Sequence, residues 1–200
     1  MKKKPIVVSM GEPSGISTEI ILKSWKYRNK YKLYPFFIVD NIQKIKKMIE
    51  YLDLKIETQV INDPCEANNF FQYNLPIFII DEKVDFKLGK PNKKNAKIIL
   101  RSIKISFDFV AQKKALGLLT LPVCKRTIKS SGFTFNGQTE FIGDLSKKKF
   151  RHKNKEIMIL STTKPSDKGK NLIVGLVTTH IPLKRICLLY TSDAADEAIG

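Results

Sequence analysis

Three short blocks of polar and glycine residues stand in a fixed order along this chain of 200 residues, each directly after an apolar, strand-like run. The blocks are GEPSGIS at 11–17, TLPVCKRTI at 120–128 followed by GQTEFIGD at 137–144, and TTHIPL at 178–183. Open α/β sheets bind ligands at the carboxyl ends of their strands, where these blocks would gather. Each block is a weak signal alone, but the ordered set predicts an enzyme.

The first block has the residues of a tight turn between a strand and a helix. Gly11 and Gly15 would permit positive φ angles and would let backbone N–H groups approach an anion at a helix N-terminus. The spacing is not GxGxxG, so the usual dinucleotide-binding fingerprint is absent. A tight turn is therefore the favoured interpretation of this block.

The second block brings a cation, an amide and a hydroxyl close to one strand end. Lys125 has the charge to hold a phosphate or a carboxylate, although taken alone it is more simply a surface lysine. Gln138 and Thr139 stand between Phe135 and Phe141. Substrate binding and a capped helix start explain Thr139 and Glu140 equally well.

The third block contains a histidine at the end of an apolar run. A neutral imidazole such as that of His180 is a good ligand for a divalent metal ion at a strand end. A catalytic metal usually has three protein ligands, so His180 needs partners from elsewhere. His152 lies in the basic segment KKKFRHKNK and is interpreted as solvated.

Strand-like and helix-like segments alternate along the chain. The strand-like runs cover residues 6–8, 36–40, 55–61, 75–80, 115–120, 157–160 and 172–177. The helix-like segments cover residues 18–26, 42–52 and 93–112. Ser17 is predicted to cap the first helix, and 63–74 is predicted to be a loop. The alternation predicts a three-layer αβα fold with a mostly parallel sheet covered on both faces.

Composition narrows the class of protein further. The chain has 36 lysines and arginines against 19 aspartates and glutamates, a net charge of +17. Five of the 36 bases are arginine, the better residue for phosphates and base edges, so a solvated lysine surface is favoured. No apolar run has the roughly 18 residues of a membrane span, and the spacing of the three cysteines indicates no disulfide framework. We therefore expect a cytoplasmic protein that binds neither nucleic acid nor membranes.

The last residues differ in composition from the rest of the chain. Residues 187–197, CLLYTSDAADE, contain no lysine, and the whole run matches a reading frame through a transposase sequencing adapter. We interpret 187–200 as a non-native, adapter-derived tail rather than a native acidic turn. On this interpretation, residues 1–186 are the natural part and are incomplete at the C-terminus.

The ordered blocks together resemble the 4-hydroxythreonine-4-phosphate dehydrogenase family of pyridoxal phosphate biosynthesis. That family carries GDPAGIGPE near its start, then TxPxxK, GHTEF and TTHxPL. The corresponding residues here are Gly11–Glu19, Thr120–Lys125, Gly137–Phe141 and Thr178–Leu183. The resemblance extends over residues 5–186.

This resemblance implies an isocitrate-dehydrogenase-like αβα fold, with residues 1–186 as the N-terminal portion of a two-domain dehydrogenase. It implies a homodimer that uses NAD and a divalent metal ion (Zn, Mg or Co) to oxidise 4-phosphooxy-L-threonine, a phosphorylated hydroxy-amino acid, whose product then loses CO₂. By position, Lys125 is the catalytic lysine of the cleft, Gln138 and Thr139 bind substrate, and His180 binds the metal. No NAD-binding residue can be assigned.

Two departures from the family pattern leave alternatives open. Gln138 stands where the family has histidine, which is consistent with a dehydrogenase for another phosphorylated four-carbon hydroxy acid. The other two metal histidines are expected beyond residue 186, so the chain as given is predicted to be inactive. A non-catalytic, polyanion-binding α/β protein is the alternative that the net charge of +17 suggests.

Overall fold

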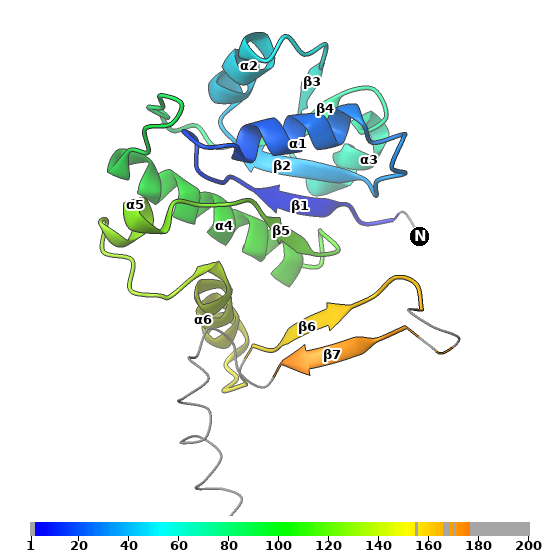
Figure 1. Cartoon of the computed structure of the whole chain (residues 1–200), viewed down its shortest axis with the longest axis vertical. Helices are drawn as coiled ribbons and strands as arrows, with labels where there is room; N and C mark the ends of the chain where they lie inside the picture. The colour runs from blue at the N-terminus through cyan, green and yellow to red at the C-terminus, as the bar shows by residue number, and fades with distance from the viewer. Residues whose placement is uncertain (1–2, 155, 166–168, 170, 177–200) are drawn as a thin grey trace, which may run out of the picture. The chain divides into compact units, whose positions relative to one another are not determined.

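The computed structural model describes residues 3–154, 156–165, 169 and 171–176. The chain divides into two compact units, Met1–His152 and Lys153–Gly200. The first unit holds a five-stranded sheet and its surrounding helices (Figure 1). The candidate site described below lies in this unit.

The sheet of the first unit consists of strands that all run parallel. In chain order they are β1 Ile6–Ser9, β2 Phe36–Asp40, β3 Thr58–Val60, β4 Leu75–Ile79 and β5 Leu118–Thr120. Their order across the sheet is β3-β4-β2-β1-β5. The central strand β2, with the sequence FFIVD, is buried at every residue. Burial on both faces is typical of a parallel strand between two layers of helices.

Helices cover both faces of this sheet. The longer ones are α1 Ser17–Lys26, α2 Ile42–Tyr51, α4 Ala96–Ala111 and α6 Gln138–Phe150. The short helical segments are η1 Pro64–Glu66, α3 Ala67–Phe70, η2 Lys93–Asn95 and α5 Lys125–Lys129. The predicted helices at 18–26, 42–52 and 93–112 are thus confirmed, with small differences at their ends.

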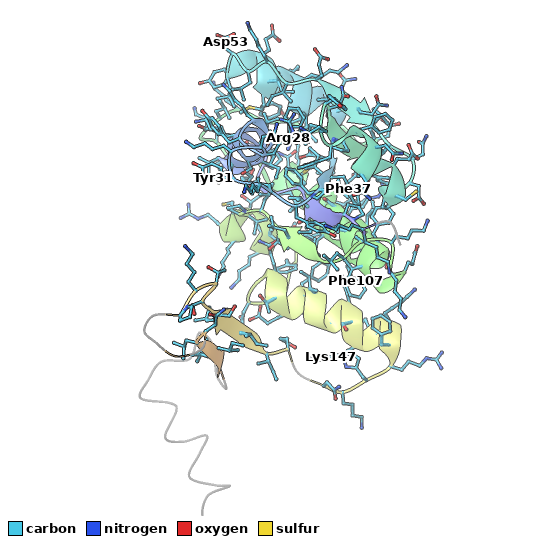
Figure 2. The ribbon with its side chains drawn as sticks, turned by 90° about the vertical axis from the view of Figure 1, so that its right-hand side faces the viewer. Arg28, Tyr31, Phe37, Asp53, Phe107 and Lys147 are labelled. Atoms are coloured by element: carbon cyan, nitrogen blue, oxygen red, sulfur yellow. The ribbon has the colours of Figure 1, made fainter. Side chains whose placement is uncertain are left out.

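Two apolar clusters hold the layers together. On one face of the sheet, Leu22 of α1 and Ile45 of α2 are fully buried in a cluster with Ile38 of β2. On the other face, Ile99 of α4 packs in a cluster with Phe37. Phe37 has no exposed surface and lies in the interior of the unit (Figure 2). Alternate residues of β2 therefore face opposite helical layers, which confirms the predicted αβα class.

The strand order creates a crevice at the carboxyl edge of the sheet. From β1 the chain adds β2, β3 and β4 on one side, and α4 then returns it so that β5 pairs with the other side of β1. Open α/β sheets bind ligands where the strand order reverses in this way. The loops that follow β1 and β5 meet at this point, and they carry the first two sequence blocks.

The prediction that Ser17 caps α1 is wrong. The N-cap position is Ile16, and it makes no side-chain capping bond. The Ser17 hydroxyl donates a hydrogen bond to the carbonyl oxygen of Pro122 at 2.7 Å. This serine therefore joins two loops of the crevice, because its hydroxyl has a partner in the loop after β5.

The prediction of a loop over 63–74 is also wrong in part. This segment contains η1 and α3. Asp63 and Glu66 form a capping box, and Pro64 occupies the first helical turn. The sequence DPCE contains both signals.

The second unit contains a β-hairpin in its described part. The strands β6 Met158–Ser161 and β7 Ile173–Leu176 pair antiparallel. They confirm the strand-like runs predicted at 157–160 and 172–177 as far as residue 176, although the predicted sheet was mostly parallel. Across the described residues of both units, no helix combines the length and apolar character that a membrane crossing needs.

Candidate functional site at the carboxyl edge of the sheet

The loop between β1 and α1 is closed by contacts with the loop after β5. The Glu12 N–H donates to the carbonyl oxygen of Pro122 at 2.8 Å, beside the bond that Ser17 makes to the same oxygen. A Cβ atom on Gly11 would lie 2.3 Å from Ser17 Oγ and 2.5 Å from the Pro122 oxygen. Glycine is required here because two backbones approach each other closely.

The remainder of this loop is a tight turn that encloses its own carboxylate. The Gly15 N–H donates to the Glu12 carbonyl at 3.1 Å, and the Ser14 N–H donates to the Glu12 carboxylate at 3.2 Å. The Ser14 N–H is therefore used by the Glu12 carboxylate and the Gly15 N–H by the backbone of the turn. Burial raises the pKa of the Glu12 carboxyl, against the opposing effects of the Ser14 N–H and the Lys44 charge. The favoured interpretation of the first block, a tight turn, is confirmed.

A buried ion pair lies next to this loop. Lys44 of α2 donates to the Asp40 carboxylate at 2.7 Å and to the Thr18 hydroxyl at 3.0 Å. The two charged side chains are only 1% and 2% exposed. Burial raises the pKa of Asp40, and the charge and hydrogen bond of Lys44 act in the opposite direction. The pair joins β2, α1 and α2, so it stabilises the scaffold under the crevice.

The second block places its side chains on two opposite faces of α5. Residues three or four positions apart share a helix face. Lys125 and Lys129 therefore lie on one face, and Arg126 and Ser130 lie on the other. Each face lines its own cavity.

A small cavity brings Lys125 and Gln138 together. Its volume is about 50 Å³, and most of its wall is apolar or aromatic. The Gln138 amide donates to the Leu121 carbonyl at 3.2 Å, while its Oε1 is buried without a partner among the described residues. We call this space the Lys125 cavity. A cation and an unpaired acceptor in an apolar wall are the features of a site for a small polar group.

Thr139 lies beside this cavity without lining it. Gln138 and Thr139 form the first turn of α6, and Thr139 is exposed to solvent. A helix does begin here, but its N-cap residue is Gly137 and makes no side-chain capping bond, so the capped start expected from Thr139 and Glu140 is not observed. The structure does place Gln138 beside Lys125. Phe133, Phe135 and Phe141 form a triangle with ring centroids 5.3–5.5 Å apart. The first two of these rings form part of the cavity wall.

The thiol of Cys124 stands at the start of α5, where it is half-buried. A hydrogen bond from the Thr127 side chain is the largest of the effects that lower its pKa. The neighbouring Glu12 carboxylate acts in the opposite direction. Cys124 is thus in electrostatic contact with the enclosed carboxylate of the first block.

His180 lies outside the described residues, so its assignment as a metal ligand stays a prediction. Within the described ranges, no three His, Cys, Asp or Glu side chains gather in a way that could hold a metal ion. His152 is not simply solvated, as predicted, but half-buried with its Nε2 atom 3.0 Å from Ser146 Oγ. The described residues alone therefore do not form the expected metal site.

Comparison with known proteins gives the family. Residues 32–200 match the family model described as "Pyridoxal phosphate biosynthetic protein PdxA". This chain belongs to the PdxA family. It is 36% identical over 141 residues to a 4-hydroxythreonine-4-phosphate dehydrogenase of Zymomonas mobilis, covering 70% of this chain and 41% of that protein.

Other relatives match more of the PdxA-family chain at lower identity. The 4-hydroxythreonine-4-phosphate dehydrogenase of Methylorubrum extorquens is 28% identical over 195 residues, which is 96% of this chain and 54% of the relative. The chain thus spans about half the length of the curated relatives that it matches.

Solved structures agree with the observed architecture. The crystal structure of 4-hydroxythreonine-4-phosphate dehydrogenase from Klebsiella pneumoniae matches with a TM-score of 0.73 at 23% identity, over 92% of this chain and 53% of that one. A Burkholderia phymatum structure of the same name matches with a TM-score of 0.71 at 19% identity, over 90% of this chain and 51% of that one. At these identities the likeness shows the fold, and it confirms the fold class that the resemblance implied.

Proposed function

We propose that this PdxA-family chain provides the amino-terminal part of a NAD-dependent dehydrogenase that oxidises 4-phosphooxy-L-threonine with the help of a divalent metal ion. The observation that carries the proposal is the Lys125 cavity, where Lys125 and Gln138 meet at the carboxyl edge of the sheet. The names of the relatives supply the reaction. Following the resemblance, we propose that the enzyme is a homodimer, and from the lack of a membrane-spanning run in the sequence we propose a cytoplasmic location.

The residues of the second block have distinct roles in this proposal. Lys125, which is exposed to solvent at the rim of the cavity, pairs with an anionic group of the substrate. Gln138 uses its amide N–H on Leu121, so its free Oε1 accepts a hydrogen bond from a substrate hydroxyl or ammonium group. Thr139 and the first N–H groups of α6 receive the phosphate, because a helix N-terminus favours an anion.

The proposed reaction requires a divalent metal ion and NAD. When bound, the metal ion would supply polarisation of the substrate hydroxyl, and NAD would supply a hydride acceptor. His180 is the proposed metal ligand from this chain. The N–H groups of the loop after β1 are occupied by Glu12, so we assign no NAD contact to that loop.

Gln138 is the reason to consider a second candidate substrate. An amide cannot change its charge with pH as a histidine can, and this difference favours a substrate whose hydroxyl and acid groups differ from those of phosphooxythreonine. The alternative is therefore a dehydrogenase for another phosphorylated four-carbon hydroxy acid.

The test uses a chimera, because the chain spans about half the length of its relatives. Residues 1–186 are joined to the carboxyl-terminal half of the Zymomonas mobilis relative, and NADH absorbance is followed with 4-phosphooxy-L-threonine and a divalent metal ion. We expect turnover by the chimera and none by the 200-residue chain. His180→Ala should lower metal-dependent turnover by about a hundredfold or more, because a metal ligand is lost.

His152→Ala is the matched control, since it removes the other histidine of the chain. This variant should keep its turnover. Undiminished turnover after His180→Ala would contradict the metal assignment. If the chimera oxidised a different phosphorylated hydroxy acid and not phosphooxythreonine, the alternative substrate would be supported.

A further inference from the structure

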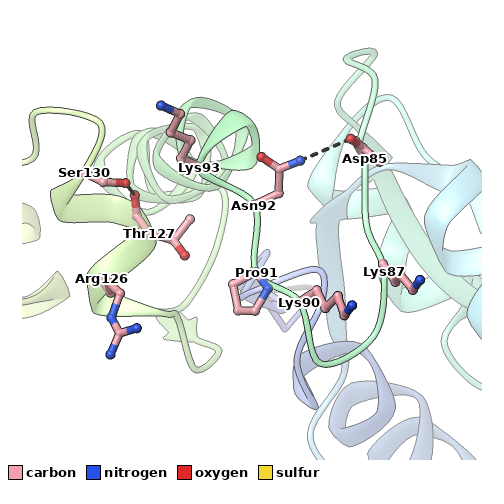
Figure 3. Close-up of a pocket in the computed structure, with 9 residues that line it drawn as sticks. All are labelled: Asp85, Lys87, Lys90, Pro91, Asn92, Lys93, Arg126, Thr127 and Ser130. Carbon is pink, nitrogen blue, oxygen red and sulfur yellow. Dashed lines mark hydrogen bonds between the residues drawn. The ribbon is translucent and has the colours of Figure 1, made fainter.

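The structure contains a second, larger cavity on the opposite face of α5, and we infer that it binds a small, highly polar organic phosphate. Its volume is about 610 Å³. It lies between α5 and the segment that joins β4 to α4 (Figure 3). The lining residues are Asp85, Lys87, Lys90, Pro91, Asn92, Lys93, Arg126, Thr127 and Ser130. We call this space the basic cavity.

The charges of the basic cavity are unbalanced. Its wall has four bases and one acid, and that acid, Asp85, accepts a hydrogen bond from Asn92 at 3.1 Å (Figure 3). Within the described part of the chain, none of the four bases has an ion-pair partner. Six other bases of the first unit do pair with carboxylates. A cleft lined by one sign of charge concentrates ligands of the opposite sign.

A helix dipole adds to this imbalance. Lys93 and Lys94 lie in η2, directly before the amino-terminal end of α4. The first turn of α4 contains no acid. Cations are unfavourable at this end of a helix, where the dipole is positive. A bound anion would offset both the dipole and the lysine charges.

The loop that carries two of the bases is held in place before any ligand binds. Asn95 is only 1% exposed, and its side chain both accepts from the Asp85 N–H at 3.2 Å and donates to the Asp85 carbonyl at 2.6 Å. At the tip, Lys90 N–H donates to the Lys87 carbonyl at 2.9 Å, in a turn around Gly89 with φ of 75°. A prearranged wall binds with a smaller loss of conformational entropy.

The rest of the wall indicates the kind of ligand. Pro91 is the only apolar residue among those that line the basic cavity, and Thr127 and Ser130 add hydroxyl groups to the side of Arg126. No aromatic ring lies in this wall, so a nucleobase would find nothing to stack on. The volume is several times that of inorganic phosphate, so a phosphate ester of a small polyol or hydroxy acid fits the wall best.

This inference goes beyond the proposed dehydrogenase activity and can fail separately from it. The Lys125 cavity lies on the other face of α5, and the two cavities share no lining residue. The test measures binding to the 200-residue chain and involves no turnover.

The experiment titrates the isotopically labelled chain with glycerol 3-phosphate and records amide chemical shifts at about 0.15 M salt, where long-range attraction is screened. We expect the shifts to concentrate at Lys87, Gly89, Lys90 and Arg126. Arg126→Gln and Lys90→Gln should each weaken binding about tenfold, because each removes a charged hydrogen-bond donor. Both positions are exposed, so neither variant should unfold the protein.

Lys97→Gln is the matched control, because Lys97 is an exposed lysine one turn along from Lys93 and lines neither cavity. It should leave binding unchanged. Equal weakening by Lys97→Gln, or shifts scattered over lysines elsewhere, would mean general attraction to a chain of charge +17 and would overturn the inference. Inorganic phosphate or adenosine monophosphate binding as tightly as glycerol 3-phosphate would also overturn it, since the first has no organic part and the second has a nucleobase on which no lining residue could stack.

Discussion

Charges on the two sides of the crevice are paired to different extents. Beside the loop after β1, Lys44 has Asp40 as a partner, and the Glu12 carboxylate accepts from its own loop. In the basic cavity, Arg126 and the lysines have no carboxylate partner in the described part of the chain. A charge that is paired internally depends on its partner, whereas unpaired charges of one sign leave a place for a ligand.

The largest expected effect tests the paired side. Lys44→Met should lower the free energy of unfolding by about 3–5 kcal/mol at neutral pH, because it leaves the Asp40 carboxylate buried without a partner. Burial already raises the pKa of Asp40, and loss of Lys44 raises it further. The destabilisation should therefore shrink as the pH falls and Asp40 becomes protonated. Urea unfolding across this pH range measures the change.

Lys104→Met is the control for this variant. Lys104 pairs with Asp108 at 3.1 Å with the same four-residue spacing, but its side chain is 61% exposed. We expect a loss below about 0.5 kcal/mol. Similar losses for the two variants would show that burial of the charge is not what matters, and the contrast between the two sides of the crevice would disappear.

A smaller effect is expected at Gly11, where the loop after β1 packs closely against the loop after β5. Gly11→Ala should lower the free energy of unfolding by about 1–3 kcal/mol, since the new Cβ collides with Ser17 and the Pro122 carbonyl. Gly117→Ala offers the comparison, because nothing lies within 4 Å of its Cβ position. Its stability should stay within about 0.5 kcal/mol of the parent. A thermal unfolding series on the two variants distinguishes close packing from a general preference for glycine.

The smallest expected effect concerns an ion pair that is exposed to solvent, unlike the buried pair of Lys44 and Asp40. Lys114 Nζ lies 2.7 Å from Asp63, and its hydrogen bond is the main reason that the pKa of Asp63 falls to about 2. Lys114→Gln should raise this pKa toward the ordinary 3.8, as carboxyl-carbon NMR can measure. The lowered pKa stabilises the fold above pH 3.8, and this contribution is lost as the pH falls through about 2. The two proteins should therefore differ least in stability at the acid end.

Lys113→Gln should leave the Asp63 titration unchanged, because Lys113 makes no ion pair among the described residues. An equal rise of the pKa in this variant would assign the effect to overall charge instead of to the hydrogen bond.

Much of the fold follows from apolar periodicity in the sequence. The runs at 36–40 and 75–80 are buried strands because their neighbours on both faces are helices, and α4 buries Ile99 and Ile103 with the spacing that predicts one apolar face. The failures arise where a residue has a distant partner. Ser17 has the type of an N-cap, but a carbonyl 105 residues away takes its hydroxyl.

The site is predictable to a lesser extent. Lys125 and Gln138 were expected to lie together, and they line one cavity. The spacing of Asp40 and Lys44 allows an ion pair, but burial of that pair depends on α1, which no local pattern reveals. The basic cavity is still harder to predict from the sequence, because Lys87 and Arg126 are far apart in a chain that is rich in lysine throughout.

One hydrogen bond connects the two sides of the crevice. The Gly89 N–H donates to the Ser14 carbonyl at 2.8 Å, so the tip of the lysine-bearing loop is fastened to the turn around Glu12. Such an amide proton exchanges with deuterated solvent only when the bond opens. Its exchange rate therefore reports how often the contact between the turn and the loop tip opens, and a single backbone proton records how firmly the glycine loop and the lysine loop hold each other.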